Sequence, residues 1–171
     1  MFKNVMDVLN DFGKFLVEEY KDRLITENVN ASDELYNSVR YMVEQGNNKF
    51  EVKLELADYW KYVENGRKAG KWPPISAIEK WIEIKPIIPR PMKNGKLPTT
   101  QQLAFLISRK IYGFITRNGK KIPIDSGGIK PRPLLQQTIN EVWDIMNEYI
   151  AEAFAKDLEK EITLQLGKMG V

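Results

Sequence analysis

The sequence predicts an α+β fold in which a small antiparallel sheet packs against long N- and C-terminal helices, with shorter helices between them. Three observations support this class. Apolar residues recur with a helical period near both ends of the chain, they alternate with a period of two over residues 39–56, and prolines and glycines interrupt the pattern between residues 66 and 133. This order of elements is typical of a sheet that is covered by helices on one face.

The first helix is expected over about residues 3–26. Apolar residues between Val5 and Tyr20 fall on one stripe, and charged residues occupy the other side. Ser32 is then expected to cap a single helical turn. Apolar and polar residues alternate over residues 39–43 and 50–56, with Gly and Asn between them, and this pattern predicts a β-hairpin.

Three short helices are expected in the centre of the chain. Residues 57–65 predict a short helix that ends at a glycine. A Pro-Pro pair stiffens the entry to a second helix, expected over about residues 75–84. Thr99 or Thr100 is expected to cap a third helix that stops near Gly113.

The last helix is expected over residues 134–166. At 1.5 Å per residue a straight helix of this length would be about 50 Å long, which is more than one small domain covers. We therefore expect its distal end, about residues 151–171, to protrude and either to pack on another molecule or to fray. The whole chain, residues 1–171, is predicted to form a single domain.

Extended loops separate the central helices. Residues 86–98 contain four prolines and are not expected to form a regular element, because proline withholds a backbone donor. Residues 114–131 contain Asn-Gly and several isoleucines, and they are expected to form a loose basic hairpin. The basic segment 66–71 is expected to be a flexible loop, and its glycines lack the pattern of a nucleotide-binding P-loop.

Two residue types are absent from the 171 residues. Without His there is no histidine general base, no Ser-His-Asp triad and no imidazole metal ligand. Without Cys there is no thiol nucleophile, disulfide, zinc knuckle or iron–sulfur site. Any catalysis would have to use carboxylate, lysine, tyrosine or hydroxyl groups, and no cofactor is predicted.

The net charge of +3 conceals an uneven distribution. Residues 1–60 carry 7 basic and 12 acidic side chains, residues 61–133 carry 16 and 4, and residues 134–171 carry 3 and 7. The net charges are −5, +12 and −4. A basic centre of this kind can bind nucleic acid, can contact the acidic ends of neighbouring copies of the chain, or can be a solvated face without a partner.

The sequence lacks the usual signals for membrane insertion and export. No run of about 18 apolar residues is present, and the first residues lack the apolar stretch and cleavage site of a signal peptide. We therefore expect synthesis in the cytosol and no membrane partner.

Three aromatic residues lie within four positions of the first short helix: Tyr59, Trp60 and Tyr62. They cannot all share one helix face. In one interpretation Tyr59 packs inward while Trp60 or Tyr62 lies at a boundary. In the other they form an aromatic anchor for a neighbouring subunit, because Trp, Tyr and Arg dominate interface cores.

Several segments resemble, in this order, one protein family. Residues 33–39 resemble the segment that leads into its first strand, and residues 57–66 (Ala-Asp-Tyr-Trp-Lys-Tyr-Val-Glu-Asn-Gly) resemble its Tyr-Ala-x-Tyr-Val-Glu-x-Gly signature. Later features correspond to residues 73–82, to residues 104–113 and to Pro133. The family comprises the tail-completion proteins, or neck and head–tail connector proteins, of tailed bacteriophages.

The resemblance implies a structural virion protein without catalytic residues, cofactor or metal. It implies a homo-oligomeric ring at the head–tail junction or in the tail, which joins a portal or adaptor to tail proteins around a channel for genomic DNA. Contacts with the DNA are expected to be weak, because a channel through which DNA slides should not hold phosphates tightly. The loops at 86–98 and 114–131 and the long last helix depart from the family, so a siphophage-type neck and a short-tail barrel both stay open.

The candidate contacts with neighbouring subunits or with the channel are aromatic and basic residues from the centre of the chain. They are Tyr59, Trp60, Tyr62, Arg67, Lys68, Lys71, Trp72, Arg90, Lys93, Lys96, Arg117, Lys120 and Lys121.

Two other functions compete with this one. The basic segment 61–133, with its tryptophans and Tyr112, is also typical of a nucleic-acid-binding module. Asp33 followed by Glu51-Val52-Lys53 resembles the acid and Glu-x-Lys pattern of metal-dependent nucleases, although Glu and Lys alternate routinely on exposed strands.

Overall fold

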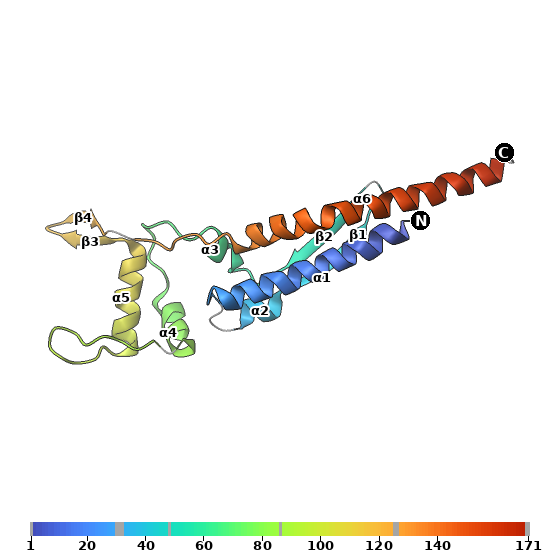
Figure 1. Cartoon of the computed structure of the whole chain (residues 1–171). Coiled ribbons are helices and arrows are strands. Elements are labelled where there is room, and N and C mark those ends of the chain that lie inside the picture. Colours follow the sequence, from blue (N-terminus) through green and yellow to red (C-terminus); the bar gives the residue numbers. More distant parts are fainter. Residues whose placement is uncertain (1, 30–32, 48, 86, 125–126, 170–171) are drawn as a thin grey trace. The chain divides into compact units, whose positions relative to one another are not determined.

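The computed structural model describes residues 2–29, 33–47, 49–85, 87–124 and 127–169 (Figure 1). The helices are α1 (Lys3–Thr26), α2 (Glu34–Ser38), α3 (Trp60–Glu64), α4 (Ile75–Ile84), α5 (Thr100–Tyr112) and α6 (Leu134–Met169). The strands are β1 (Arg40–Gln45), β2 (Phe50–Glu55), β3 (Phe114–Arg117) and β4 (Lys120–Pro123), and they form two antiparallel hairpins. The predicted α+β class, with long N- and C-terminal helices, is confirmed.

The chain divides into two compact units. Unit 1 contains Met1–Glu27, Tyr36–Ala57 and Leu134–Val171, and unit 2 contains Asn28–Leu35 and Asp58–Pro133. The sequence predicts a single connector-type domain over residues 1–171, and the division into two compact units does not test that prediction.

Unit 1 is built from the first and last helices of the chain and the first hairpin. α1 packs along α6, and the apolar stripe that the sequence places between Val5 and Tyr20 is buried. Phe12 and Leu16 of α1 form a core cluster with Val142 of α6, and Val52 and Leu54 of β2 pack against that cluster. The core of unit 1 therefore lies between two helices and one face of a hairpin.

Gly13 has a structural role that helix propensity does not reveal. A Cβ atom added to Gly13 would lie 2.8 Å from Cγ of Tyr41, well inside van der Waals contact. The glycine lowers the intrinsic stability of α1, but it lets the aromatic ring of β1 approach the helix backbone. Any larger residue here would push the hairpin away from α1.

Hydrogen bonds and an ion pair connect both ends of α1 to α6. The buried carboxylate of Asp157 accepts hydrogen bonds from the backbone N–H of Val5 at 2.9 Å and from Nδ2 of Asn4 at 2.7 Å. Near the other end Arg23 pairs with Glu141. Burial raises the pKa of Asp157, but the hydrogen bonds from Val5 and Asn4 outweigh it and hold the pKa below its usual value.

The first hairpin has the predicted position. Arg40 pairs with Glu55 and Gln45 with Phe50, and the N–H of Gly46 donates to the carbonyl of Lys49 at 2.9 Å to close the turn. The helical turn that was expected before the hairpin is α2. The predicted cap of that turn, Ser32, lies outside the described residues.

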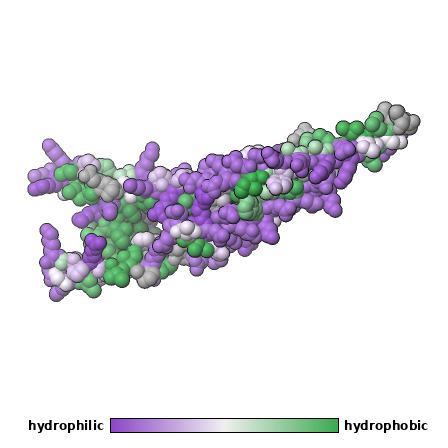
Figure 2. Space-filling view, in the orientation of Figure 1, coloured by the Kyte–Doolittle hydropathy of each residue, from purple (hydrophilic) through white to green (hydrophobic). Residues whose placement is uncertain are grey.

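The distal end of α6 continues beyond the start of α1. Leu158, Ile162 and Leu166 recur at every fourth position, and Ile162 is 58% exposed. Among the described residues of unit 1 this apolar stripe stays exposed, and Figure 2 shows hydrophobic residues at this end of the helix. No helix in the described part of the chain is both long enough and apolar enough to span a membrane.

In unit 2 the helix boundaries follow the predicted signals. Thr99 and Gln102 form a reciprocal capping box at the start of α5, and Gly113 ends the helix in the left-handed conformation with φ 79°. The described residues of loop 86–98 form no helix or strand, as expected, and they contain a turn in which the N–H of Met92 donates to the carbonyl of Lys96 at 2.8 Å. The second hairpin, β3–β4, turns at Asn118 and Gly119, which both have positive φ.

Candidate interaction surface

The basic segment 66–71 is anchored, so the prediction of a flexible loop was wrong. The N–H of Arg67 donates to the carbonyl of Ile129 at 2.9 Å, and the N–H of Ile129 donates back to Arg67 at 2.8 Å. The N–H of Gly70 donates to the carbonyl of Tyr112 at 2.8 Å. Each of these partners lies more than 40 residues further along the chain. A local sequence pattern cannot predict contacts over such a separation.

Segment 66–71, the C-terminal end of α5 and the segment around Gly127 meet at one place, which we call the crossing. Two glycines make this close approach possible. A Cβ atom on Gly113 would lie 2.6 Å from Cβ of Ala69 and 2.9 Å from Cα of Gly127. The backbones at positions 113 and 127 therefore touch directly, with segment 66–71 beside them. The crossing fixes the C-terminal end of α5 against two loops.

An aromatic cluster lies next to the crossing, since Tyr112 and Phe114 flank Gly113 in the sequence. The ring of Trp72 lies 5.5 Å from the ring of Phe105 and 5.1 Å from that of Tyr112, and Tyr112 lies 5.5 Å from Phe114. The ammonium group of Lys121 lies 5.9 Å from the centre of the Tyr112 ring, which is within cation–π range. The cluster therefore joins residues from a loop, a helix and the second hairpin.

Arg67 holds the loop that carries Trp72. Its guanidinium group donates to the carbonyls of Lys71 at 3.3 Å and Trp72 at 3.5 Å. Two of the predicted residues, Trp72 and Lys121, thus meet at Tyr112, and Arg67 joins them through its hydrogen bonds to the carbonyls of Lys71 and Trp72. The sequence prediction omitted Phe105 and Phe114 from this group, although Phe105 and Tyr112 are seven positions apart and so share one face of α5.

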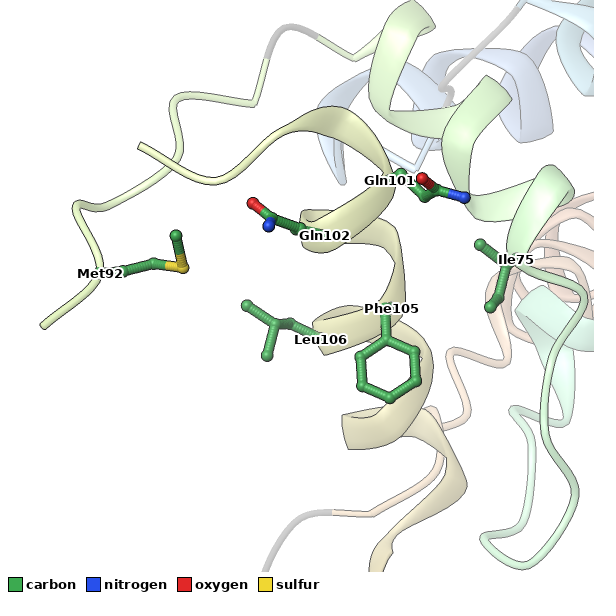
Figure 3. Close-up of a pocket in the computed structure, with 6 residues that line it drawn as sticks. All are labelled: Ile75, Met92, Gln101, Gln102, Phe105 and Leu106. Carbon is green, nitrogen blue, oxygen red and sulfur yellow. The ribbon is translucent and has the colours of Figure 1, made fainter. Parts of the chain in front are cut away.

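An open apolar groove lies next to the aromatic cluster. It has a volume of about 410 Å³ and is lined by Ile75, Met92, Gln101, Gln102, Phe105 and Leu106. Figure 3 shows Met92, on loop 86–98, facing Gln102 and Leu106 of α5. Phe105 is 45% exposed, and a hydrophobic area covers α4 and α5 in Figure 2. The groove thus connects the proline-rich loop to two helices.

The aromatic residues of α3 belong to a different place in unit 2. Tyr59 and Tyr62 line a hollow of about 300 Å³ together with Val63 and Lys85. Tyr62 is 58% exposed, whereas Tyr59 and Trp60 are half-buried. Of the two residues that the sequence offers for the boundary, Tyr62 is therefore the one that faces solvent.

The other predicted basic residues do not converge on one site. Lys68 is exposed on the anchored segment, and Arg117 and Lys120 lie at the exposed tip of the second hairpin. The candidates of loop 86–98 are all exposed: Arg90, Lys93 and Lys96. Unit 2 therefore carries its cations as a dispersed surface rather than as a pocket.

The nuclease-like residues form an ion-pair ladder on β1 and β2. Glu51 pairs with Lys49 at 2.7 Å, and Lys53 pairs with Glu44. The hydrogen bond from Lys49 lowers the pKa of Glu51, and the hydrogen bond to Glu44 raises the pKa of Lys53. Asp33 belongs to unit 2. Within the described ranges, no group of three Asp, Glu, His or Cys side chains is placed to hold a metal ion.

The opposite charges of the sequence blocks persist in the two folded units, although the difference between the units is smaller. Unit 1 carries 10 basic and 16 acidic side chains, a net charge of −6, and unit 2 carries 16 basic and 7 acidic side chains, a net charge of +9. The acidic N- and C-terminal blocks fold together, and the basic centre forms the other unit. Each copy of the chain therefore offers one acidic body and one basic body.

Comparisons of the chain with protein-family models, with curated protein sequences and with solved structures find no match.

Proposed function

We propose that this chain is a structural virion protein, a subunit of a homo-oligomeric ring in the head–tail connector, neck or tail barrel of a tailed bacteriophage. The ring would join a portal or adaptor to tail proteins, around a channel through which genomic DNA passes. The single observation that carries the proposal is the opposite net charge of the two units, −6 and +9. Complementary charge on two different surfaces lets identical copies contact one another head to tail.

The family-like segments support the proposal by where they fall on the helices. Residues 57–66 form α3 and the glycine after it, and residues 73–82 form the entry and most of α4. Residues 104–113 form most of α5 and its glycine cap, and Pro133 directly precedes α6. A common order of helix boundaries is what a related connector would share.

Exposed apolar surface also favours assembly over an isolated monomer. The groove beside α5 and the distal stripe of α6 leave Phe105, Leu106, Leu158 and Ile162 at least partly exposed. Exposed apolar residues that cluster in this way are typical of surfaces that other molecules cover. Both units contain such a surface.

Imaging of assembled particles tests the proposal. The purified full chain is examined by mass photometry and by cryo-electron microscopy, alone and with portal and tail proteins of the same virion. We expect closed rings, or incorporation into a portal complex, and only weak binding of DNA. A chain that binds DNA tightly as a monomer and never joins a ring would contradict the proposal.

A nucleic-acid-binding module is the second candidate, and the second hairpin is the observation that favours it. Arg117, Lys120 and Lys121 lie around its tip, and cations gathered in this way are typical of phosphate contacts. Fluorescence anisotropy with single-stranded and duplex DNA at several salt concentrations tests this function. A true binding module should show an affinity that falls steeply with salt, and the double variant Arg117→Ala/Lys120→Ala should reduce the slope by about two.

A further inference from the structure

One face of the second hairpin is exposed and combines two cations with two isoleucines. The strand register places Arg117 opposite Lys120 and Ile115 opposite Ile122, and side chains two positions apart on a strand share a face. Ile115 and Ile122 are each 39% exposed. The other face carries Lys121 and turns toward Tyr112. We call the four residues Ile115, Arg117, Lys120 and Ile122 the hairpin surface.

The hairpin surface holds an uncompensated pair of like charges. Residues directly opposite in an antiparallel pair have Cβ atoms about 5 Å apart, and like charges in these positions destabilise the pair. Neither Arg117 nor Lys120 forms an ion pair with any described residue. An anionic surface that covered the hairpin would remove this repulsion.

The outward face of α6 has the opposite arrangement. Four exposed carboxylates recur at helical spacing along it and form what we call the acidic stripe: Asp144, Glu148, Glu152 and Glu159. Like charges four positions apart on a helix repel each other. The pairs Asp144 with Glu148 and Glu148 with Glu152 are of this kind, and the ion pair of Glu152 with Lys156 at 3.7 Å relieves the second of them in part.

The two surfaces match in spacing and in composition. Asp144 and Glu148 lie about 6 Å apart along the helix axis, close to the separation of Arg117 and Lys120 across the hairpin. Ile145 and Tyr149, which are exposed beside the acidic stripe, offer apolar contacts for the two isoleucines. Each surface thus supplies the opposite charge that the other lacks, and both carry exposed apolar residues that docking would bury.

We propose that the hairpin surface of one copy of the chain docks on the acidic stripe of a second copy, an inference that rests on the proposed function as a ring subunit. The contact is heterologous, because it joins two different surfaces. An open assembly of docked copies therefore has a free hairpin surface at one end and a free acidic stripe at the other, and a suitable rotation between copies closes it into a ring. The charges make the contact sensitive to salt.

Charge reversal on each surface tests this docking. A hairpin variant carries Arg117→Glu and Lys120→Glu, and a helix variant carries Asp144→Lys and Glu148→Lys. Either variant alone sets like charges face to face, so sedimentation velocity of the full chain at low salt should show self-association weakened by about tenfold or more. An equimolar mixture of the two variants should assemble again, because each surface then meets an opposite charge on the other variant.

Matched controls use exposed charges of α1. Lys3→Glu with Lys14→Glu, and Asp11→Lys with Glu18→Lys, change the net charge by the same amounts outside both surfaces. They should assemble like the wild type, and circular dichroism should show the same helix content for every variant. Normal assembly of the hairpin variant and the helix variant, or a mixture that does not recover, overturns the docking.

The outcomes also separate this inference from the proposed function. Wild-type rings that are insensitive to both reversals overturn the docking and leave the proposed function intact. A wild-type chain that stays monomeric at every salt concentration, also with portal and tail proteins, overturns both. A hairpin variant that loses DNA binding but is not rescued in the mixture assigns the hairpin to nucleic acid and overturns the docking.

Discussion

Replacing Gly113 by alanine should destabilise unit 2 strongly, for two separable reasons. The residue has φ 79°, and the left-handed conformation costs a residue with a Cβ atom about 1–2 kcal/mol. The new Cβ atom would also lie 2.6 Å from Cβ of Ala69 and 2.9 Å from Cα of Gly127. Overpacking of this kind costs about 1–3 kcal/mol, so we expect a total loss of about 2–5 kcal/mol.

Two other glycines isolate the two terms. Gly119 has φ 73° with no atom within 4 Å of an added Cβ, so Gly119→Ala should show the conformational cost alone, about 1–2 kcal/mol. Gly127 lies against Gly113 without a positive φ, so Gly127→Ala should show the steric cost alone, about 1–3 kcal/mol. The sum of the two should approach the loss for Gly113→Ala.

Hydrogen exchange resolved by peptide is the suitable assay, because it reports each unit separately. Peptides from α5 should lose protection in the Gly113→Ala variant, whereas peptides from the middle of α6 should keep it. Urea unfolding followed by tryptophan fluorescence gives the free energy of unfolding, with a signal weighted toward unit 2, because three of the four tryptophans (Trp60, Trp72 and Trp81) lie in unit 2 and only Trp143 lies in unit 1. A Gly113→Ala variant as stable as Gly119→Ala would refute the close approach of the backbones at positions 113 and 127.

Three further predictions concern the hydrogen bonds of Asp157 to the start of α1, the core of unit 1 and the aromatic cluster of unit 2. The lowered pKa of Asp157 means that its contribution to stability is present above the usual carboxyl pKa of about 4 and disappears as the pH falls through the lower native value. In the Asp157→Asn variant, the free energy of unfolding should therefore fall less steeply with decreasing pH in the acid range than in the wild type, as circular dichroism would measure. Leu16→Ala leaves a cavity beside Phe12 and Val142, and it should lower the free energy of unfolding in urea by about 2–5 kcal/mol. A urea midpoint equal to that of the wild type would argue against that packing. Trp72→Ala removes two ring pairs and should cost about 1–3 kcal/mol, and unaltered exchange of residues 66–72 would contradict the anchoring role of the cluster.

Much of the fold could be predicted because its signals are local. The helical period of residues 3–26, the alternation around the first hairpin and the capping box at Thr99 each act within a few residues. The boundaries of α1 and α5 follow from these signals, and the start of α4 follows from the Pro-Pro pair before it. Local chemistry also places the Asn-Gly turn of the second hairpin, because both residues accept a positive φ.

The interaction surface could be predicted only in part, because it depends on contacts between distant segments. Composition identifies Trp72 and Lys121 as candidates, but their meeting at Tyr112 needs the glycine crossing of residues 113 and 127. A glycine in a sequence does not reveal which distant backbone it admits, so the segment 66–71 was expected to be flexible. The separation of charge was visible in the sequence, whereas its assignment to two units required the pairing of α1 with α6.

The pairing of α1 with α6 also sets the order in which the chain can fold during synthesis. Unit 2 is made as a nearly continuous stretch, but the core of unit 1 stays incomplete until the ribosome has passed Val142. At about 5–20 residues per second, the apolar stripe of α1 waits on the order of 5 to 25 s for its helical partner. The first hairpin follows α1 closely along the chain and packs against it in the folded structure. During that interval it is the part of the native packing partner that has already been synthesised. The hairpin, with its six-residue strands, can therefore cover part of the α1 stripe before α6 is made.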